Sequence, residues 1–177
     1  MRDEAVNRAW AVFSVLDADR DGVLAQADFE LMASRVEAAA WRSAPAQREA
    51  LREEFRRWWT ALAAHLDTEG DGRVDFDEYR GGVLSPERFA DTVAAFARAL
   101  AVLGDPEGAG TVARGVFVEL MVTIGFPPDR SEAVFDALGP SADDHVTVAA
   151  WEAGVRDFFA PDRAGVAGDH LADPYPA

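Results

Sequence analysis

Cysteine and lysine are both missing from this sequence of 177 residues. Without cysteine, the chain can form no disulfide, no thiolate metal site and no cysteine nucleophile. The same absence fits a reducing compartment, and we expect the protein in the cytoplasm. Because every basic side chain is an arginine, and because Ala, Gly, Val and Asp are abundant, the composition indicates a GC-rich bacterial genome.

Long hydrophobic runs and excess positive charge are also missing. No stretch approaches the 18 or more apolar residues that a membrane span needs, so we expect no membrane partner. The amino terminus carries Asp3 and Glu4 and passes directly into an amphipathic pattern, so we expect no secretion signal. The 32 acidic residues outnumber the 17 basic ones and give a net charge of -15. This negative charge would repel a nucleic-acid backbone, so we expect no nucleic-acid partner. We also expect the protein to be a monomer.

Catalytic signatures are scarce. His65, His145 and His170 are isolated from any nucleophile motif, and the sequence shows no glycine-rich loop of the phosphate-binding kind. The sequence therefore predicts a protein that is not an enzyme. Trp58 and Trp59 could suggest a ligand box, but their spacing favours a core position for one and a partly exposed position for the other.

Hydrophobic residues make up 49% of the chain, and many recur with the period of an amphipathic helix. The pattern predicts a helix over 3–16 that ends at an acidic loop, and a second helix after that loop. A start signal at 43–45 and apolar residues from Leu51 to Leu66 mark a long helix that again ends at an acidic loop. Tyr79 opens a short helix that we expect to end at Gly81 and Gly82, because glycine weakens a helix interior.

The second half repeats the same order of helix, loop and helix. Ser85-Pro86-Glu87 is a helix start signal, and three more helices follow before residue 160. From Pro161 the tail is rich in proline and glycine, and we expect it to be extended. Leu171 and Tyr175 either fold back into an apolar cleft or belong to a frayed terminus, and the sequence leaves both possibilities open.

The first acidic loop, Asp17 to Asp28, has the pattern of a twelve-residue calcium loop. Ca²⁺ takes six to eight oxygen ligands, so short carboxylates at alternate positions can converge on one ion. Gly22 at position 6 permits the sharp turn, and position 7 supplies only its backbone carbonyl. The candidate ligands at positions 1, 3, 5, 7 and 12 are Asp17, Asp19, Asp21, Val23 and Asp28.

The second acidic loop runs from Asp67 to Glu78 and has the same frame. Its candidate ligands at positions 1, 3, 5, 7, 9 and 12 are Asp67, Glu69, Asp71, Arg73 through its carbonyl, Asp75 and Glu78. Glu78 can offer both oxygens to the ion, whereas Asp28 in the first loop is one methylene shorter. We therefore expect two Ca²⁺ sites, of which the second is the stronger and the first tolerates Mg²⁺ better.

Two further loops keep this frame but lose its ligands. The third begins at Asp105 and has Val116 at position 12, and the fourth begins at Gly139 and has Ala150 there. Without an acid at position 12, we expect both loops to be free of metal. Their role is structural, because a single helix-loop-helix unit leaves its apolar face uncovered.

With four such units, the sequence resembles the EF-hand superfamily. The first two loops begin 67 − 17 = 50 residues apart and the third follows after 105 − 67 = 38. This uneven spacing resembles the sarcoplasmic calcium-binding proteins and their bacterial relative calerythrin. The resemblance implies an all-α fold in which four EF-hand units pair into two lobes, with short two-stranded pairings between loops. It also implies a protein that buffers or signals intracellular calcium.

We expect three segments, namely an N-terminal EF-hand pair over 1–84, a C-terminal pair with degenerate loops over 85–160, and the tail over 161–177. Calcium sensors expose methionine-rich grooves, but only Met32 and Met121 are internal here. This favours a calcium buffer or signal modulator. The alternative is a calcium-dependent regulator that binds an unknown protein partner through an apolar cleft or through the degenerate lobe.

Overall fold

The computed structural model describes residues 3–175, apart from the side chains at positions 86 and 87. The first two residues of the expected N-terminal pair and the last two of the expected tail lie outside this range. Helices dominate the described part of the chain. They are α1 (Asp3–Leu16), α2 (Gln26–Ala39), α3 (Pro45–Leu66), α4 (Phe76–Val83), α5 (Pro86–Leu103), α6 (Arg114–Ile124), α7 (Pro128–Ala137), α8 (Val148–Phe158) and the 3₁₀ helix η1 (Ala167–Leu171).

Two short antiparallel strand pairs join the loops. Strands β1 (Val23–Leu24) and β2 (Val74–Asp75) pair the first two loops, and β3 (Thr111–Ala113) and β4 (His145–Thr147) pair the other two. Each pair places one buried aliphatic residue opposite another, Leu24 against Val74 and Val112 against Val146. The expected all-α fold of four helix-loop-helix units, paired through their loops, is confirmed.

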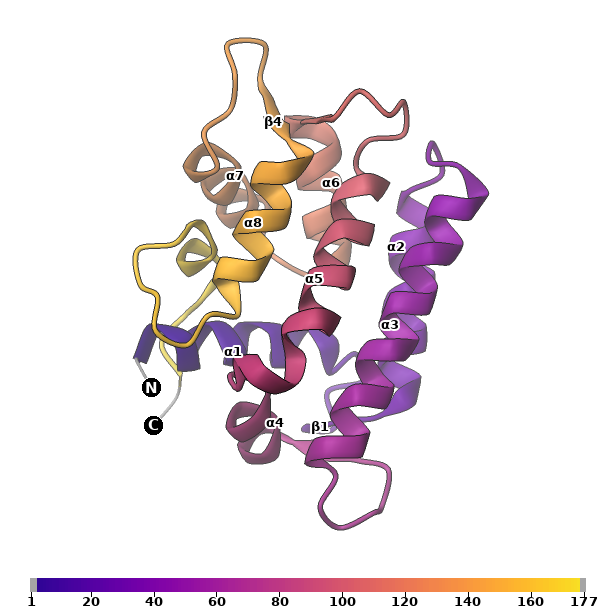
Figure 1. The fold of residues 1–177 in the computed structure, drawn as a ribbon, viewed down its shortest axis with the longest axis vertical. Helices are drawn as coiled ribbons and strands as arrows, with labels where there is room; N and C mark the ends of the chain where they lie inside the picture. Colours follow the sequence, from indigo (N-terminus) through magenta and orange to yellow (C-terminus); the bar gives the residue numbers. More distant parts are fainter. Residues whose placement is uncertain (1–2, 176–177) are drawn as a thin grey trace.

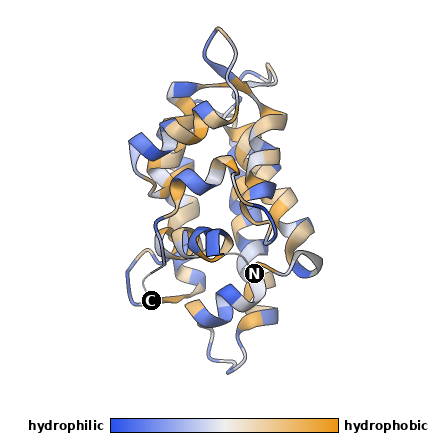
Figure 2. Ribbon diagram, turned by 90° about the vertical axis from the view of Figure 1, so that its left-hand side faces the viewer, coloured by the Kyte–Doolittle hydropathy of each residue, from blue (hydrophilic) through white to orange (hydrophobic). Residues whose placement is uncertain are grey.

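The two strand pairs lie at opposite ends of the molecule (Figure 1). Between them, α3 packs on α5, α5 packs on α8, and α2 contacts α6, so that the two halves share one hydrophobic core. The Phe55 and Phe96 rings meet at this junction with centroids 5.1 Å apart. The helices carry both hydrophobic and hydrophilic stretches, and the loop at the lower end is hydrophilic (Figure 2). Within residues 3–175, no helix combines the length and the apolar character needed to cross a bilayer.

Helix α4 is short, as expected, but it begins at Phe76 and not at Tyr79, and it continues one residue past Gly82, to Val83. Gly82 is buried where α4 packs against α3. A Cβ atom at this position would lie 1.9 Å from Cδ2 of Leu66, whereas a Cβ at Gly81 would meet nothing within 4 Å. Gly82 is therefore required by the close approach of the two helices and does not end the helix.

The prediction of one buried and one partly exposed tryptophan was wrong, because both side chains are buried. Trp58 is 3% exposed and Trp59 is 8% exposed. Helix α3 lies between two neighbours, α5 and α2. The Trp58 ring packs against Phe96 of α5 at 4.7 Å between centroids, and the Trp59 ring packs against Phe29 of α2 at 5.5 Å. The helices on the two sides of α3 thus cover both rings.

The tail also differs from the expected extended segment, because residues 167–171 form the 3₁₀ helix η1. This helix packs against α7, α8 and α1. Leu171 is buried at 7% exposure, and the Tyr175 ring packs against aromatic side chains of the N-terminal half. Of the two possibilities for Leu171 and Tyr175, folding back onto the core is the one observed. The apolar surface that they bury supplies the physical reason.

Candidate metal centre

Each acidic loop is fixed at both ends by buried residues. In the first loop, Leu16 precedes the acids and Phe29 follows them, and both are buried. The amide of Asp17 still donates to the carbonyl of Phe13 at 2.9 Å, which continues the helical pattern of α1 into the loop. Leu66 and Tyr79 bound the second loop in the same way and are also buried. The candidate ligand residues therefore extend from a buried frame.

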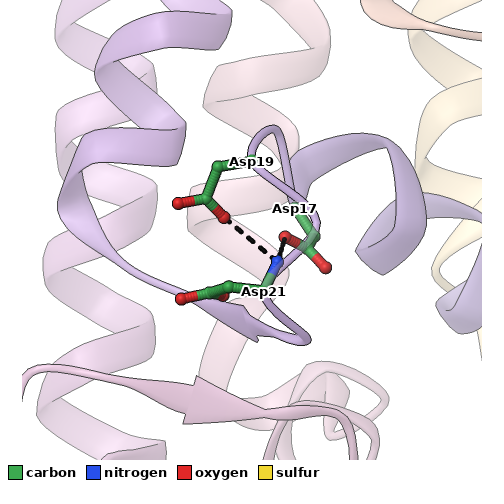
Figure 3. A group of neighbouring side chains, drawn as sticks. All are labelled: Asp17, Asp19 and Asp21. Atoms are coloured by element: carbon green, nitrogen blue, oxygen red, sulfur yellow. Dashed lines mark hydrogen bonds between the residues drawn. The ribbon is translucent and has the colours of Figure 1, made fainter.

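Three carboxylates gather in the first loop (Figure 3). One oxygen each from Asp17, Asp19 and Asp21 lies within 4.8 Å of the others. The amide of Asp21 donates to Asp17 Oδ1 at 3.1 Å and to Asp19 Oδ1 at 3.2 Å, and the amide of Gly22 donates to Asp17 Oδ2 at 3.0 Å. These bonds hold the loop in a tight turn, in which Arg20 and Gly22 have φ of 63° and 87°.

This donor set fits a hard divalent cation. Ligand oxygens lie about 2.3 to 2.6 Å from Ca²⁺, so two oxygens on opposite sides of one ion are separated by about 5 Å. The 4.8 Å grouping of Asp17, Asp19 and Asp21 agrees with that spacing. No nitrogen or sulfur ligand belongs to the group, which disfavours Zn²⁺ and Cu²⁺ relative to Ca²⁺ and Mg²⁺.

Asp28, the expected ligand at position 12, is buried at 5% exposure and lies outside this group of three. Its Oδ1 accepts the amide of Ala18 at 3.0 Å, and its Oδ2 accepts the amide of Ala25 at 2.9 Å. Burial raises the pKa of the Asp28 carboxyl, and the two amide bonds partly oppose that rise. Asp28 thus ties the two ends of the loop together.

Val23, the expected carbonyl ligand at position 7 of the first loop, lies in β1. It pairs with Asp75 of the second loop, which places the two loops side by side. The Val23 amide donates to Asp21 Oδ1 at 3.1 Å. Both loops are therefore held in one register by their backbone.

The second loop has the same backbone frame. Asp67 Oδ1 accepts the amides of Gly70 at 2.7 Å and Asp71 at 3.1 Å, and its Oδ2 accepts the amide of Gly72 at 2.9 Å. Gly70 and Gly72 have φ of 71° and 77°, at the positions where the first loop has Arg20 and Gly22. Among the described residues, Asp67, Glu69 and Asp71 do not gather as closely as the acids of the first loop.

Asp75 and Glu78 cap the start of α4 reciprocally. Asp75 Oδ1 accepts the Glu78 amide at 2.9 Å, and Glu78 Oε2 accepts the Asp75 amide at 3.2 Å. Glu78 Oε1 accepts the Thr68 hydroxyl at 2.6 Å. Glu78 thus closes its loop as Asp28 closes the first. The hydroxyl of Thr68 was missed by sequence reasoning, because position 2 of a calcium loop supplies no ligand.

Sequence reasoning also missed the side chain of Arg73. Only its carbonyl was assigned a role, but its Nη1 lies 3.6 Å from Asp21 Oδ2 in the first loop. The signal was present in the sequence as a basic residue at position 7 of an otherwise acidic loop. The strand register that brings the two loops together was needed to identify its partner.

The third and fourth loops keep the frame without the ligand set. Asp105 at position 1 of the third loop accepts the amides of Ala109 at 2.8 Å and Gly110 at 2.7 Å, as Asp17 and Asp67 do in their loops. Arg114 spans both loops, with Nη2 2.7 Å from Asp136 Oδ1 and Nε 2.9 Å from Asp144 Oδ2. The Arg114 guanidinium lowers the pKa of the Asp144 carboxyl. A side-chain cation therefore neutralises acids at this end of the molecule.

Comparisons with known proteins agree with this geometry. A family model described as an EF-hand domain pair matches residues 8–84. No curated protein matches the sequence. A solved structure of a Streptomyces coelicolor calcium-binding protein, described in terms of prokaryotic calcium-mediated regulation, is 25% identical, with a TM-score of 0.72. The alignment covers 86% of this chain and 95% of that one.

Two further solved structures are similar in fold alone. The Ca²⁺-regulated photoprotein mitrocomin from the jellyfish Mitrocoma cellularia is 16% identical, with a TM-score of 0.73, over 96% of this chain and 91% of that one. The coelenterazine-binding protein from Renilla muelleri, in its calcium-loaded apo form, is 19% identical, with a TM-score of 0.62, over 97% of both chains. At these identities, the two likenesses show only that the fold is shared.

Proposed function

We propose that this chain binds two Ca²⁺ ions and acts as a calcium buffer or signal modulator in the cytoplasm, because a model of the EF-hand domain pair matches residues 8–84. One ion is held by Asp17, Asp19, Asp21, the Val23 carbonyl and Asp28. The other is held by Asp67, Glu69, Asp71, the Arg73 carbonyl, Asp75 and Glu78. The observation that carries the proposal is the cluster of Asp17, Asp19 and Asp21 in the first loop, in which one oxygen from each residue lies within 4.8 Å of the others, close enough to contact one ion.

The paired loops support a two-ion stoichiometry. Both have an aspartate at position 1 that accepts the amides at positions 5 and 6, and both end in an acid at position 12 that closes the loop. The third loop has the same turn, but its position 12 is Val116, and position 12 of the fourth is Ala150. The proposed division is therefore a calcium-binding pair over 1–84, a metal-free pair over 85–160 and a tail over 161–177.

The choice of ion follows from the ligands. All proposed ligands are oxygens, which both Ca²⁺ and Mg²⁺ accept. Mg²⁺ demands a smaller, near-octahedral shell, and Asp28 reaches less far than Glu78. Mg²⁺ should therefore compete at the first loop more than at the second.

Calorimetric titration of chelator-stripped protein tests the proposal. The intact chain should take up two Ca²⁺ ions, whereas Asp19→Ala and Glu78→Gln should each take up one. Asp143→Asn is a matched control, because Asp143 stands at position 5 of the fourth loop, which should carry no ion. Heat of binding that is unchanged in Asp19→Ala and Glu78→Gln would contradict the assignment of ligands.

A second candidate function, calcium-dependent regulation of a protein partner, is favoured by the buried tail. The Streptomyces coelicolor protein that this chain resembles is described in terms of calcium-mediated regulation. An apolar dye distinguishes the two functions. A large rise in dye fluorescence on adding Ca²⁺ supports a regulator, because apolar surface has become exposed, and no rise supports a buffer.

A further inference from the structure

We propose that residues 167–175 of the tail occupy the binding site of a partner protein on this chain. It occupies a groove on α1, α7 and α8 that accepts an acidic, aromatic-ended segment of that partner once Ca²⁺ fills the second loop. The calcium trigger rests on the proposed function, whereas the groove itself rests on the contacts that hold the tail.

The first contact is made by Arg8 of α1, whose side chain is fully buried at 0% exposure. Its Nη1 pairs with Asp169 Oδ1 at 2.5 Å, its Nε donates to the carbonyl of Phe158 at 2.5 Å, and its Nη2 donates to the carbonyl of Ala160 at 2.7 Å. A buried guanidinium is destabilising unless its donors are satisfied. When Asp169 leaves with the tail, another carboxylate is needed to replace it.

The second contact is made by Arg130 of α7. Its Nη2 pairs with Asp173 Oδ1 at 2.5 Å, and its Nη1 donates to the carbonyl of Leu171 at 3.3 Å. Two arginines therefore meet two aspartates four residues apart, in a protein whose net charge is -15. This local positive charge selects an acidic segment.

The apolar side of the tail faces the core. Leu171 is 7% exposed, and with Ala167 and Gly168 it lines an almost wholly apolar cavity of about 90 Å³. Gly168 packs so closely on α8 that a Cβ atom there would lie 2.2 Å from Cδ2 of Phe158. The groove thus requires one small residue and one aliphatic residue at defined places.

The end of the tail contacts the calcium-binding half. The Tyr175 amide donates to Asn7 Oδ1 at 2.9 Å, and the Tyr175 ring lies 5.2 Å from the Trp10 ring and 4.8 Å from the Phe76 ring, between centroids. The full pattern is acid, aliphatic, acid and aromatic at alternate positions 169, 171, 173 and 175. Asp169 and Leu171 present this pattern from η1, and Asp173 and Tyr175 present it from the chain that follows.

Phe76 connects this contact to the second calcium loop. It stands at position 10 of that loop, is the first residue of α4, and lies two residues before Glu78. The Glu78 oxygens accept the Thr68 hydroxyl and the Asp75 amide. Turning both oxygens to an ion moves the start of α4, and Phe76 moves with it. The Tyr175 contact then weakens, and the tail leaves the groove.

A fluorescent peptide with the sequence of residues 166–175 tests the inference on the full-length chain. It should bind the calcium-loaded protein at least about tenfold more tightly than the chelated protein. Asparagine at the positions of Asp169 and Asp173 in the peptide should remove that binding. Gly168→Ala should admit the peptide without calcium, whereas Gly115→Ala, which adds the same methyl group in open space, should behave as the unmodified chain.

Tyr175→Ala supplies a second variant in case Gly168→Ala disturbs folding, and it too should bind peptide without calcium. The inference is overturned if calorimetry shows a calcium-filled protein that ignores the peptide. It is also overturned if size-exclusion chromatography shows that calcium makes two copies exchange tails. Peptide binding to both variants, with no calcium uptake, would support the groove and contradict the proposed function instead.

Discussion

Arg73 Nη1 in the second loop lies 3.6 Å from Asp21 Oδ2 in the first. The pair crosses from one candidate metal site to the other, because β1 and β2 hold the two loops in register. Both side chains are largely solvent-accessible, at 59% for Arg73 and 41% for Asp21. The guanidinium would therefore compete with a metal ion for Asp21, one of the proposed ligands of the first loop.

Arg73→Gln should raise the Ca²⁺ affinity of the first loop. Exposed ion pairs contribute about 0.2 to 1 kcal/mol, so the gain should be up to about fivefold and should shrink at high salt. The position-7 carbonyl is retained by the substitution. Calorimetric titration at low and high ionic strength measures the effect, with Arg57→Gln on α3 as the control. An affinity that is the same with and without Arg73 at low salt would rule out the competition.

Gly82→Ala should destabilise the fold, and Gly81→Ala should not. A methyl group at Gly82 meets Leu66, and overpacking of this kind costs about 1 to 3 kcal/mol. The same change at Gly81 is in open space and should stabilise α4 by about 0.5 to 1 kcal/mol. Urea unfolding of the two variants provides the comparison. Equal stability in both would show that α3 and α4 do not approach so closely.

Asp28→Glu should make the first loop more selective for calcium. The longer side chain can reach an ion with both oxygens, which suits the larger shell of Ca²⁺ better than the octahedral shell of Mg²⁺. Calcium titration in millimolar Mg²⁺ should therefore show that Mg²⁺ competes less at the first loop of Asp28→Glu than at the first loop of the unmodified chain. If Mg²⁺ competes equally at both loops of the unmodified chain, this prediction loses its basis.

The Arg114 pairs predict an acid-dependent stability in the C-terminal half. The pKa of Asp144 lies below its ordinary value of 3.8 because Arg114 stabilises the charged form. The ionised Asp144 therefore contributes fully to the free energy of unfolding when the pH is above that ordinary value. This contribution is lost as the pH falls through the lower pKa of Asp144 in the folded protein. Thermal unfolding should show Asp144→Asn to be less stable than the unmodified chain at pH 5, and the difference should shrink toward pH 3. A difference independent of pH would contradict this pairing.

Much of the fold followed from residues whose environment is local. The strand pairing that the resemblance implied is observed, with Leu24 opposite Val74 at position 8 of their loops. The acids at alternate positions predicted the turn of each loop, and Asp17 and Asp67 accept the same backbone amides. The turn of each loop depends only on spacing along the chain.

Contacts between distant segments could not be predicted in this way. Gly82 was interpreted as a helix end, since nothing in the sequence shows that Leu66 packs against it. The fully buried Arg8 finds its acceptors 150 or more positions away, at Phe158, Ala160 and Asp169. Likewise, only the packing of α2 and α5 on both sides of α3 explains why Trp58 and Trp59 are both buried.

Counting the ions bound to each chain tests the central claim most directly. Native mass spectrometry of chelator-stripped protein, after addition of calcium, should show two ions per chain, with loss of one ion in Glu78→Gln. A chain that remains free of calcium, or that binds four ions, would contradict the assignment of two competent and two degenerate loops.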